Sequence, residues 1–392
     1  MSNSLPVTKL DLIVDALQES TNLSIEIQLK VLQILPTFFQ CYSAFIYDEL
    51  LAKFLLVCSS LQAATKPTSV SNTASATFLQ LINSVFEKVN EEDKSGIEPS
   101  NSVPIDNDET ISISTCAYDS QRIFLDLCTL IEHHKPSFLK TNYITEDFGF
   151  ELLESVIKNN RLLFVNHTEL GYLLRVRVAP ILLRFLSSSK DFNIMVRVSR
   201  LIILAIKEQF ANLKIENEVT LSLITHILLK ESASPYWKKV LCMEVYREIL
   251  KDFDLVKIIF SEYDGNKTEE RKPVLLEFLN ASLLIIQESG SILNTGEIVQ
   301  VPYAQDPVAP SNSTAASSFS SSVSKRKLST SGYTGERPEE FKGMSMTNSY
   351  TKVCYIDSFD KTDPPPVLET YLLYLICQCV TLISEGVFAL SL

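Results

Sequence analysis

Histidine and cysteine are the side chains of this sequence most able to support catalysis or metal binding, and their spacing argues against both. Only four histidines occur, and the rings of His133 and His134 would diverge by about 100° on a helix, too far to grip one ion. Cys377 and Cys379 invite a redox or metal interpretation, but positions i and i+2 of a helix project about 200° apart. We therefore predict no catalytic, cofactor-binding or metal-binding residues, and we interpret the buried cysteines as small apolar side chains.

Motifs for phosphate binding and hydrolysis are also missing from the sequence. No G-x-x-x-x-G-K-[ST], G-x-G-x-x-G, G-x-S-x-G or H-E-x-x-H pattern occurs. The chain has 10 glycines in 392 residues, against a typical share of about 7%. Few positions can therefore adopt the positive φ angles that hairpins and phosphate-binding loops require.

A cluster of basic residues is the strongest charge signal in an acidic chain. The formal net charge is -12, which argues against a protein that wraps nucleic acid. Between Gly171 and Lys207, however, seven basic residues stand against one acid, Asp191. The cluster is either a docking face for an acidic partner or anionic lipid, or a solvated face paired with acids on neighbouring helices. The candidate docking residues are Arg175, Arg177, Arg184, Arg197, Arg200 and Lys207.

Apolar residues recur every three or four positions from Leu10 to Ile286, which predicts one amphipathic helix after another. We expect Pro36 to kink or end the second of these helices near Leu35. Four prolines, at positions 136, 180, 235 and 273, recur at intervals compatible with armadillo and HEAT units of about 40–47 residues. The predicted fold is an all-α, armadillo/HEAT-like α-solenoid of stacked helix pairs.

Two segments depart from the helical pattern. Residues 93–115 are acidic and polar, with few large apolar groups, and we interpret them as a flexible linker. Residues 291–352 are rich in serine and proline, and we expect a disordered insertion there. Residues 353–392 should then supply a terminal helix that packs back on the solenoid. Its apolar run is shorter than the roughly 20 residues of a membrane-spanning helix.

Several stretches resemble the N-terminal region of the monensin-sensitivity (Mon-two) family of Golgi and endosomal scaffolds, which are relatives of the large Sec7-type Arf exchange factors. Residues 25–36 (IEIQLKVLQILP) and 70–80 (VSNTASATFLQ) are similar to its DCB (dimerisation and cyclophilin-binding) domain. Residues 166–175 (NHTELGYLLR) and 237–244 (WKKVLCME) are similar to its HUS (homology upstream of Sec7) domain. Residues 260–264 (FSEYD) look like a degenerate form of the HUS-box Tyr-Asp signature.

The resemblance implies the C-terminal part of a DCB-like domain over residues 1–92 and a HUS-like armadillo domain over residues 116–290. It further implies a non-enzymatic scaffold in vesicle trafficking, cytoplasmic and peripheral on trans-Golgi network and endosome membranes. The implied partners are a Dopey-type scaffold, an Arf-like small GTPase and a flippase complex, with an anionic membrane surface and a homodimer as further options. Two alternatives stay open: a regulator of Arf-like GTPases with exchange activity, and a cargo-binding HEAT-type transport receptor.

Overall fold

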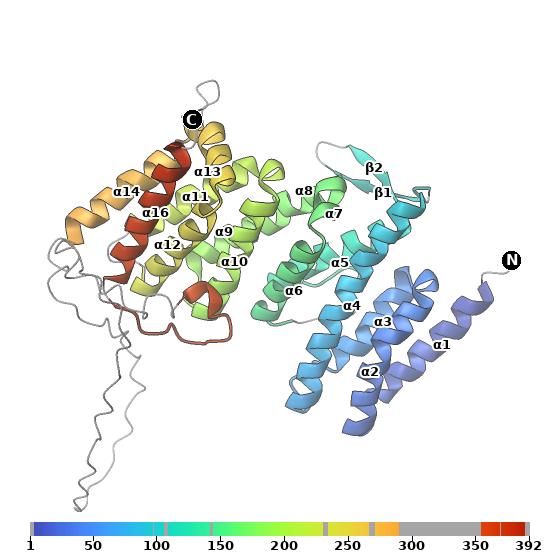
Figure 1. Ribbon diagram of the computed structural model, residues 1–392. Coiled ribbons are helices and arrows are strands. Elements are labelled where there is room, and N and C mark those ends of the chain that lie inside the picture. The colour runs from blue at the N-terminus through green and yellow to red at the C-terminus, as the bar shows by residue number, and fades with distance from the viewer. Residues whose placement is uncertain are drawn as a thin grey trace, which may run out of the picture.

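The chain folds into an elongated stack of helices, with helix α1 at one end and helices α14 and α16 at the other (Figure 1). This computed structural model describes residues 4–96, 98–105, 109–141, 144–229, 234–265, 271–289, 354–368 and 370–388. The helices of the first part are α1 (Ser4–Ser20), α2 (Ile25–Tyr42), α3 (Asp48–Ser60), α4 (Thr68–Ser95), α5 (Thr115–Ile131), α6 (Glu146–Asn159) and α7 (Arg161–Asn166). Those of the second part are α8 (Thr168–Leu173), α9 (Ala179–Ser188), α10 (Phe192–Glu208), α11 (Lys214–Leu229), α12 (Tyr236–Leu250), α13 (Phe253–Ile259), α14 (Val274–Glu288) and α16 (Tyr371–Phe388).

Side chains at the helix starts explain several of these boundaries. The Asp191 carboxylate accepts a hydrogen bond from the Ile194 N–H at 3.0 Å and so caps α10. Pro235 and Pro273 stand immediately before α12 and α14, where a missing N–H costs nothing. Two of the four prolines that punctuate the sequence therefore stand at helix starts.

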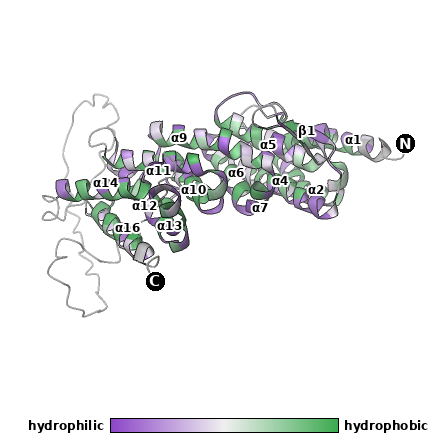
Figure 2. Cartoon of the chain, turned by 90° about the horizontal axis from the view of Figure 1, so that it is seen from above, coloured by the Kyte–Doolittle hydropathy of each residue, from purple (hydrophilic) through white to green (hydrophobic). Residues whose placement is uncertain are grey.

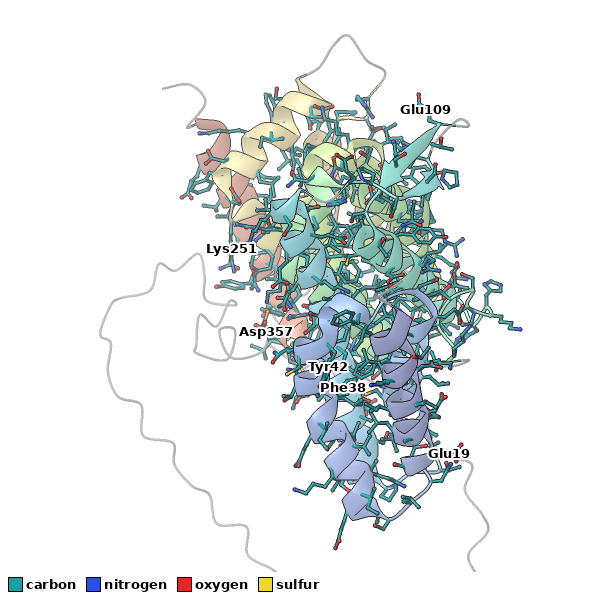
Figure 3. All side chains as sticks on the ribbon, turned by 90° about the vertical axis from the view of Figure 1, so that its right-hand side faces the viewer. Glu19, Phe38, Tyr42, Glu109, Lys251 and Asp357 are labelled. Carbon is teal, nitrogen blue, oxygen red and sulfur yellow. The ribbon has the colours of Figure 1, made fainter. Side chains whose placement is uncertain are left out.

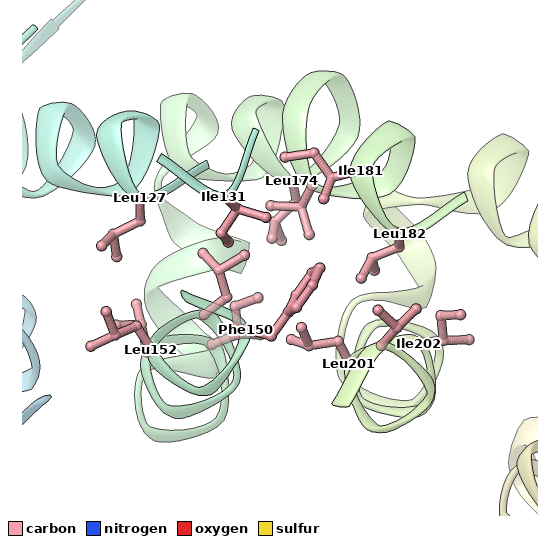
Figure 4. Close-up of a cluster of buried hydrophobic side chains, with 14 of the residues drawn as sticks. Leu127, Ile131, Phe150, Leu152, Leu174, Ile181, Leu182, Leu201 and Ile202 are labelled. Atoms are coloured by element: carbon pink, nitrogen blue, oxygen red, sulfur yellow. The ribbon is translucent and has the colours of Figure 1, made fainter. Parts of the chain in front are cut away.

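Two layers of helices enclose one continuous core. Helices α4, α6, α10, α12 and α16 follow one another in one layer, and α5, α9, α11 and α14 lie in the other. Between them, Leu127, Phe150, Leu182 and Leu201 are each at most 4% exposed (Figure 4). Seen from above, the body is long and narrow (Figure 2). The predicted all-α solenoid of stacked helices is confirmed.

Polar contacts between neighbouring repeats recur at an almost constant sequence separation. Lys53 binds Asp11 across 42 residues and Arg200 binds Glu154 across 46. The Tyr263 hydroxyl donates to the Lys214 carbonyl across 49 residues. This spacing of 42–49 residues is one repeat length, so each repeat is joined to the next by hydrogen bonds as well as by apolar packing.

Residues 93–115, expected to be a flexible linker, contain ordered structure. Helix α4 continues to Ser95, and strands β1 (Asn101–Pro104) and β2 (Thr110–Ile113) form an antiparallel hairpin with Val103 opposite Ile111. Val103 and Ile113 are only 3% and 6% exposed. These few apolar side chains, which alternate along the strands, hold the hairpin against the stack.

Pro36 does not end its helix near Leu35, so that half of the expectation was wrong. Helix α2 runs through Pro36 to Tyr42. Its last turn is held because Phe39 is only 3% exposed and its ring lies 5.8 Å from that of Phe54. Phe38 and Tyr42 also lie side by side on α2 (Figure 3), with ring centroids 4.9 Å apart. Tertiary burial outweighs the hydrogen bond that proline removes.

Helix α16 occupies the next position in its layer, against α12 and α13. Its Tyr371, Leu375 and Ile376 are at most 1% exposed. The segment 291–352, for which we expect disorder, lies outside the described residues. Among the helices that the structure does describe, none is both long and apolar enough to cross a bilayer.

Candidate interaction surface

The histidines and cysteines do not form a reactive cluster in the described part of the chain. No group of three or more His, Cys, Asp or Glu residues there could hold a metal ion. Cys377 is exposed while Cys379 is buried, and burial raises the pKa of the Cys379 thiol to about 12. That thiol therefore stays protonated near neutral pH.

Two of the predicted docking arginines share one carboxylate on the α5 side of the stack. Arg177 and Arg184 approach the two Glu132 oxygens at 2.9 Å and 3.4 Å. Arg177 lies in a π-helical turn, Leu174–Val178, between α8 and α9, and Arg184 lies about two helical turns further along. The two arginines and the glutamate that they share therefore carry a net charge of about +1.

Two more arginines project from α10 toward α6. Arg200 binds Glu154 with two nitrogens, at 2.6 Å and 2.9 Å, and Arg197 lies 3.4 Å from Glu151. Both guanidinium groups also stand over the ring of Phe359, at 5.9 Å for Arg197 and 5.2 Å for Arg200. A segment about 160 residues further along the chain therefore covers this pair.

Arg175 lies in a different setting, at the rim of a cleft of about 300 Å³ beside the β-hairpin. Its guanidinium lies 5.6 Å from the Tyr172 ring, and Val165, which is 55% exposed, lines the same cleft. Glu109, at the hairpin, also lines this cleft.

Lys207 lies at the C-terminal end of α10 in an open hollow. Lys251, Phe253 and Lys257 line the same hollow, and the exposed fraction of Phe253 is 40%. Lys251 and Asp357 lie along one edge of the stack, and Glu109 lies on the other (Figure 3). Of the six candidate docking residues, the structure thus pairs Arg177 with Arg184 and Arg197 with Arg200, and it places Arg175 and Lys207 apart from both pairs.

Glu244 is a site residue to which we assigned no role from the sequence. It lies in the middle of α12, is fully buried, and burial raises the pKa of its carboxyl group. Its oxygens accept hydrogen bonds from the Ile356 N–H at 3.0 Å and the Tyr371 hydroxyl at 2.9 Å. Glu244 therefore fastens both the segment before α16 and α16 itself to the stack. A single acid inside the apolar run VLCMEVY is the signal that could have revealed it.

The Tyr-Asp pair of the degenerate HUS box joins three elements. Tyr263 is 2% exposed and donates to the Lys214 carbonyl at 2.8 Å, at the start of α11. The Asp264 carboxylate accepts from the N–H groups of Leu275 and Leu276 at 3.1 Å and 2.9 Å, in the first turn of α14. The hydrogen bonds of this pair hold the start of α14 and the start of α11 to the same turn.

His167 connects α4 to α8. Its Nε2 atom lies 3.0 Å from Asp93 and its Nδ1 atom 2.8 Å from Glu169. The Glu169 hydrogen bond, followed by that of Asp93, raises the pKa of His167 to about 9. The side chain is 15% exposed, so these contacts are largely shielded from water.

We expect His167→Gln to destabilise the chain more at about pH 6 than at about pH 10. Below the usual histidine pKa of 6.5, the contribution of the charged ring is fully present, and it is lost as pH rises through about 9. A rise of this size corresponds to roughly 3 kcal/mol at most. Urea denaturation at both pH values measures the difference, with the exposed His134→Gln as the control. Equal destabilisation at both pH values would contradict this assignment.

The first two helices carry exposed aliphatic side chains. Leu12 on α1 is 69% exposed, and Ile27 and Ile34 on α2 are 41% and 50% exposed. Such residues at the end of a helical stack are suited to contact with another helix, whether from the same protein or from a partner.

A helical-repeat protein with polar links between its repeats and charged and apolar patches along its faces belongs to the class that binds other macromolecules through extended surfaces. The comparisons with known families agree with this class. The Mon2/Sec7/BIG1-like dimerisation and cyclophilin-binding (DCB) domain matches residues 1–93, and the Mon2/Sec7/BIG1-like HUS domain matches residues 116–271. The chain belongs to the Mon2 family, which confirms the resemblance seen in the sequence.

Similar proteins occur from yeasts to humans. Protein MON2 of Saccharomyces cerevisiae is 32% identical over 392 residues, covering 98% of this chain and 22% of the relative. The Schizosaccharomyces pombe Protein MON2 homolog is 29% identical, covering 96% of this chain and 22% of the relative. The human Protein MON2 homolog is 26% identical, covering 87% and 21%. The chain thus spans about a fifth of the length of these relatives.

Proposed function

We propose that this chain is the DCB–HUS part of a non-enzymatic scaffold in vesicle trafficking at the trans-Golgi network and endosomes. The observation that carries the proposal is the continuous two-layered helical stack of a Mon2-family chain. Its outer faces carry charged side chains and exposed aliphatic side chains. Partners of the proposed scaffold are a Dopey-type protein, an Arf-like small GTPase and a flippase complex. The exposed aliphatic residues of α1 and α2 provide a surface for dimerisation, the activity named in the matched DCB domain.

The scaffold makes its peripheral membrane contact, in this proposal, through the hollow that holds Lys207, Lys251 and Lys257. Lysine ammonium groups near an anionic surface contribute about 1 kcal/mol each. Phe253 adds a half-exposed ring between them. Acids lie here too, because Lys251 pairs with Glu248, Lys257 pairs with Asp254, and Asp252 and Asp254 line the hollow. Arg197 and Arg200 are less suited because their side chains are only 12% and 26% exposed, against 52% for Lys251.

Replacing Lys207 and Lys251 by glutamate should reduce binding to vesicles that contain phosphatidylserine by at least about tenfold at low salt. Co-sedimentation with vesicles with and without phosphatidylserine measures this loss. The matched control is Lys9→Glu with Lys30→Glu, which changes the net charge equally on α1 and α2. Equal binding by the two double variants would remove the membrane role from this hollow.

The absence of enzymatic activity is tested separately. Purified chain should leave the rate of nucleotide exchange on an Arf-like GTPase unchanged, whereas a measurable acceleration would favour a catalytic regulator.

A further inference from the structure

Residues 355–357 form a short turn that packs against both α10 and α12, and we call the surface of these two helices that the segment 354–360 covers the groove. The groove residues belong to the HUS domain, and the segment comes from far along the chain. Three kinds of contact hold the segment, one for each part of it.

An aromatic pocket receives the first part of the segment. The Tyr355 ring packs edge to face on Phe192, with centroids 5.2 Å apart, and Phe192 packs in the same way on Trp237 at 5.4 Å. Tyr355 is 1% exposed, so its ring is an anchor of the kind that dominates binding energy at interfaces.

A polar clamp holds the backbone of the next residue. The Ile356 N–H donates to Glu244 at 3.0 Å, and the Ile356 carbonyl accepts from Arg200 at 3.4 Å. Both backbone hydrogen-bonding groups of Ile356 are thus held by charged side chains of the groove. Such contacts fix the direction of a peptide whatever its side chain at this position.

An arginine pair holds the last part. Phe359 lies beneath Arg197 and Arg200, and Asp357 interacts electrostatically with Arg200. Phe359 is 44% exposed and Asp357 is exposed. Arg197 and Arg200 also bind Glu151 and Glu154, so the segment adds an acidic and an aromatic contact to guanidinium groups that are already paired with acids.

We propose that this groove is a docking site for partner segments with the pattern aromatic, aliphatic, acidic, any residue, aromatic, and that residues 355–359 (YIDSF) are its tethered occupant. A partner protein reaches the groove by displacing this occupant. The proposal deepens the scaffold function above and rests on it for the meaning of the partner, whereas the binding measurement below does not involve membranes or GTPases.

The test uses a fluorescent peptide of residues 354–366 and the full chain. The peptide should bind the variant Tyr355→Ala with Phe359→Ala at least about tenfold more tightly than it binds the unchanged chain. In the unchanged chain the tethered occupant competes at an effective concentration on the order of millimolar. Adding Arg197→Ala and Arg200→Ala to that variant should weaken peptide binding again by at least about tenfold.

Controls keep the result interpretable. A peptide with alanine in place of its tyrosine and phenylalanine should not bind either protein. A second variant, Asp357→Asn with Phe359→Ala, changes only exposed side chains and should show a smaller gain in the same direction because it keeps the Tyr355 anchor, so loss of folding in the first variant does not end the test. Equal binding to the unchanged chain and to both variants would overturn the proposal. So would variants that bind phosphatidylserine vesicles more strongly without binding the peptide, because the arginine pair would then serve a membrane.

Discussion

Replacing Asp126 by alanine should lower the free energy of unfolding by about 3–5 kcal/mol. Asp126 is 1% exposed, and its carboxylate accepts from the N–H groups of Ser137, Phe138 and Leu139 at 2.8, 2.6 and 2.7 Å. The variant leaves three backbone donors in a buried place where water cannot replace the lost acceptor. The loop that contains these three donors also places the side chains of Phe138 and Leu139 in the core, where they are 3% and 4% exposed.

Urea denaturation of the intact chain measures this effect. Asp254→Ala is the matched control because that side chain is 90% exposed, and its removal should cost less than about 0.5 kcal/mol. Asp126→Asn should fall between the unchanged chain and Asp126→Ala, since an amide oxygen can still accept from part of the set. Equal effects of Asp126→Ala and Asp254→Ala would show that water replaces the carboxylate.

The sequence predicts the stack well because the stack depends on local information. A helix must bury one stripe of apolar residues, so a spacing such as that of Val31, Leu35 and Phe39 specifies both the helix and its inner face. The intervals between prolines indicated the repeat length. The sequence therefore predicts that each helix packs on its neighbours in the same repeat and in the next one. It does not predict which residues touch.

Interactions between distant segments explain what the sequence did not predict. Pro36 lies inside a helix because Phe39 meets Phe54 from the next helix. The hairpin has only a few apolar residues on each strand, too few for a clear period-two pattern. Such outcomes depend on which surfaces meet, and helix propensity alone carries no information about that.

The basic residues show the same limit. Arg200 and Lys207 both lie on α10, but their surroundings differ. Arg200 binds Glu154 from the preceding repeat, while Lys207 lies in an open hollow. Charge spacing gives the helix on which a side chain lies, and only the fold gives its partner. Whether these residues dock partners stays a prediction.

Glu244→Ala should release residues 354–388 from the stack while the remaining helices stay folded. Removing the carboxylate leaves the Ile356 N–H and the Tyr371 hydroxyl without their acceptor inside the core. Arg247, whose side chain is only 13% exposed, also loses its favourable electrostatic interaction with this carboxylate. We expect a cost of about 3 kcal/mol, which corresponds to roughly 100-fold faster amide exchange in the released segment.

Hydrogen exchange followed by mass spectrometry separates this local release from general destabilisation. In Glu244→Ala, peptides from residues 354–368 and from α16 should exchange faster, while those from α4 and α5 should not change. Glu248→Ala is the matched control because it lies one turn away on α12 and pairs with Lys251 instead of the docked segment. Glu244→Gln keeps one acceptor oxygen and should show an intermediate effect. Unchanged exchange in residues 354–368 of Glu244→Ala would mean that Tyr355 and α16 dock without this carboxylate, and that burial of their side chains alone holds the segment.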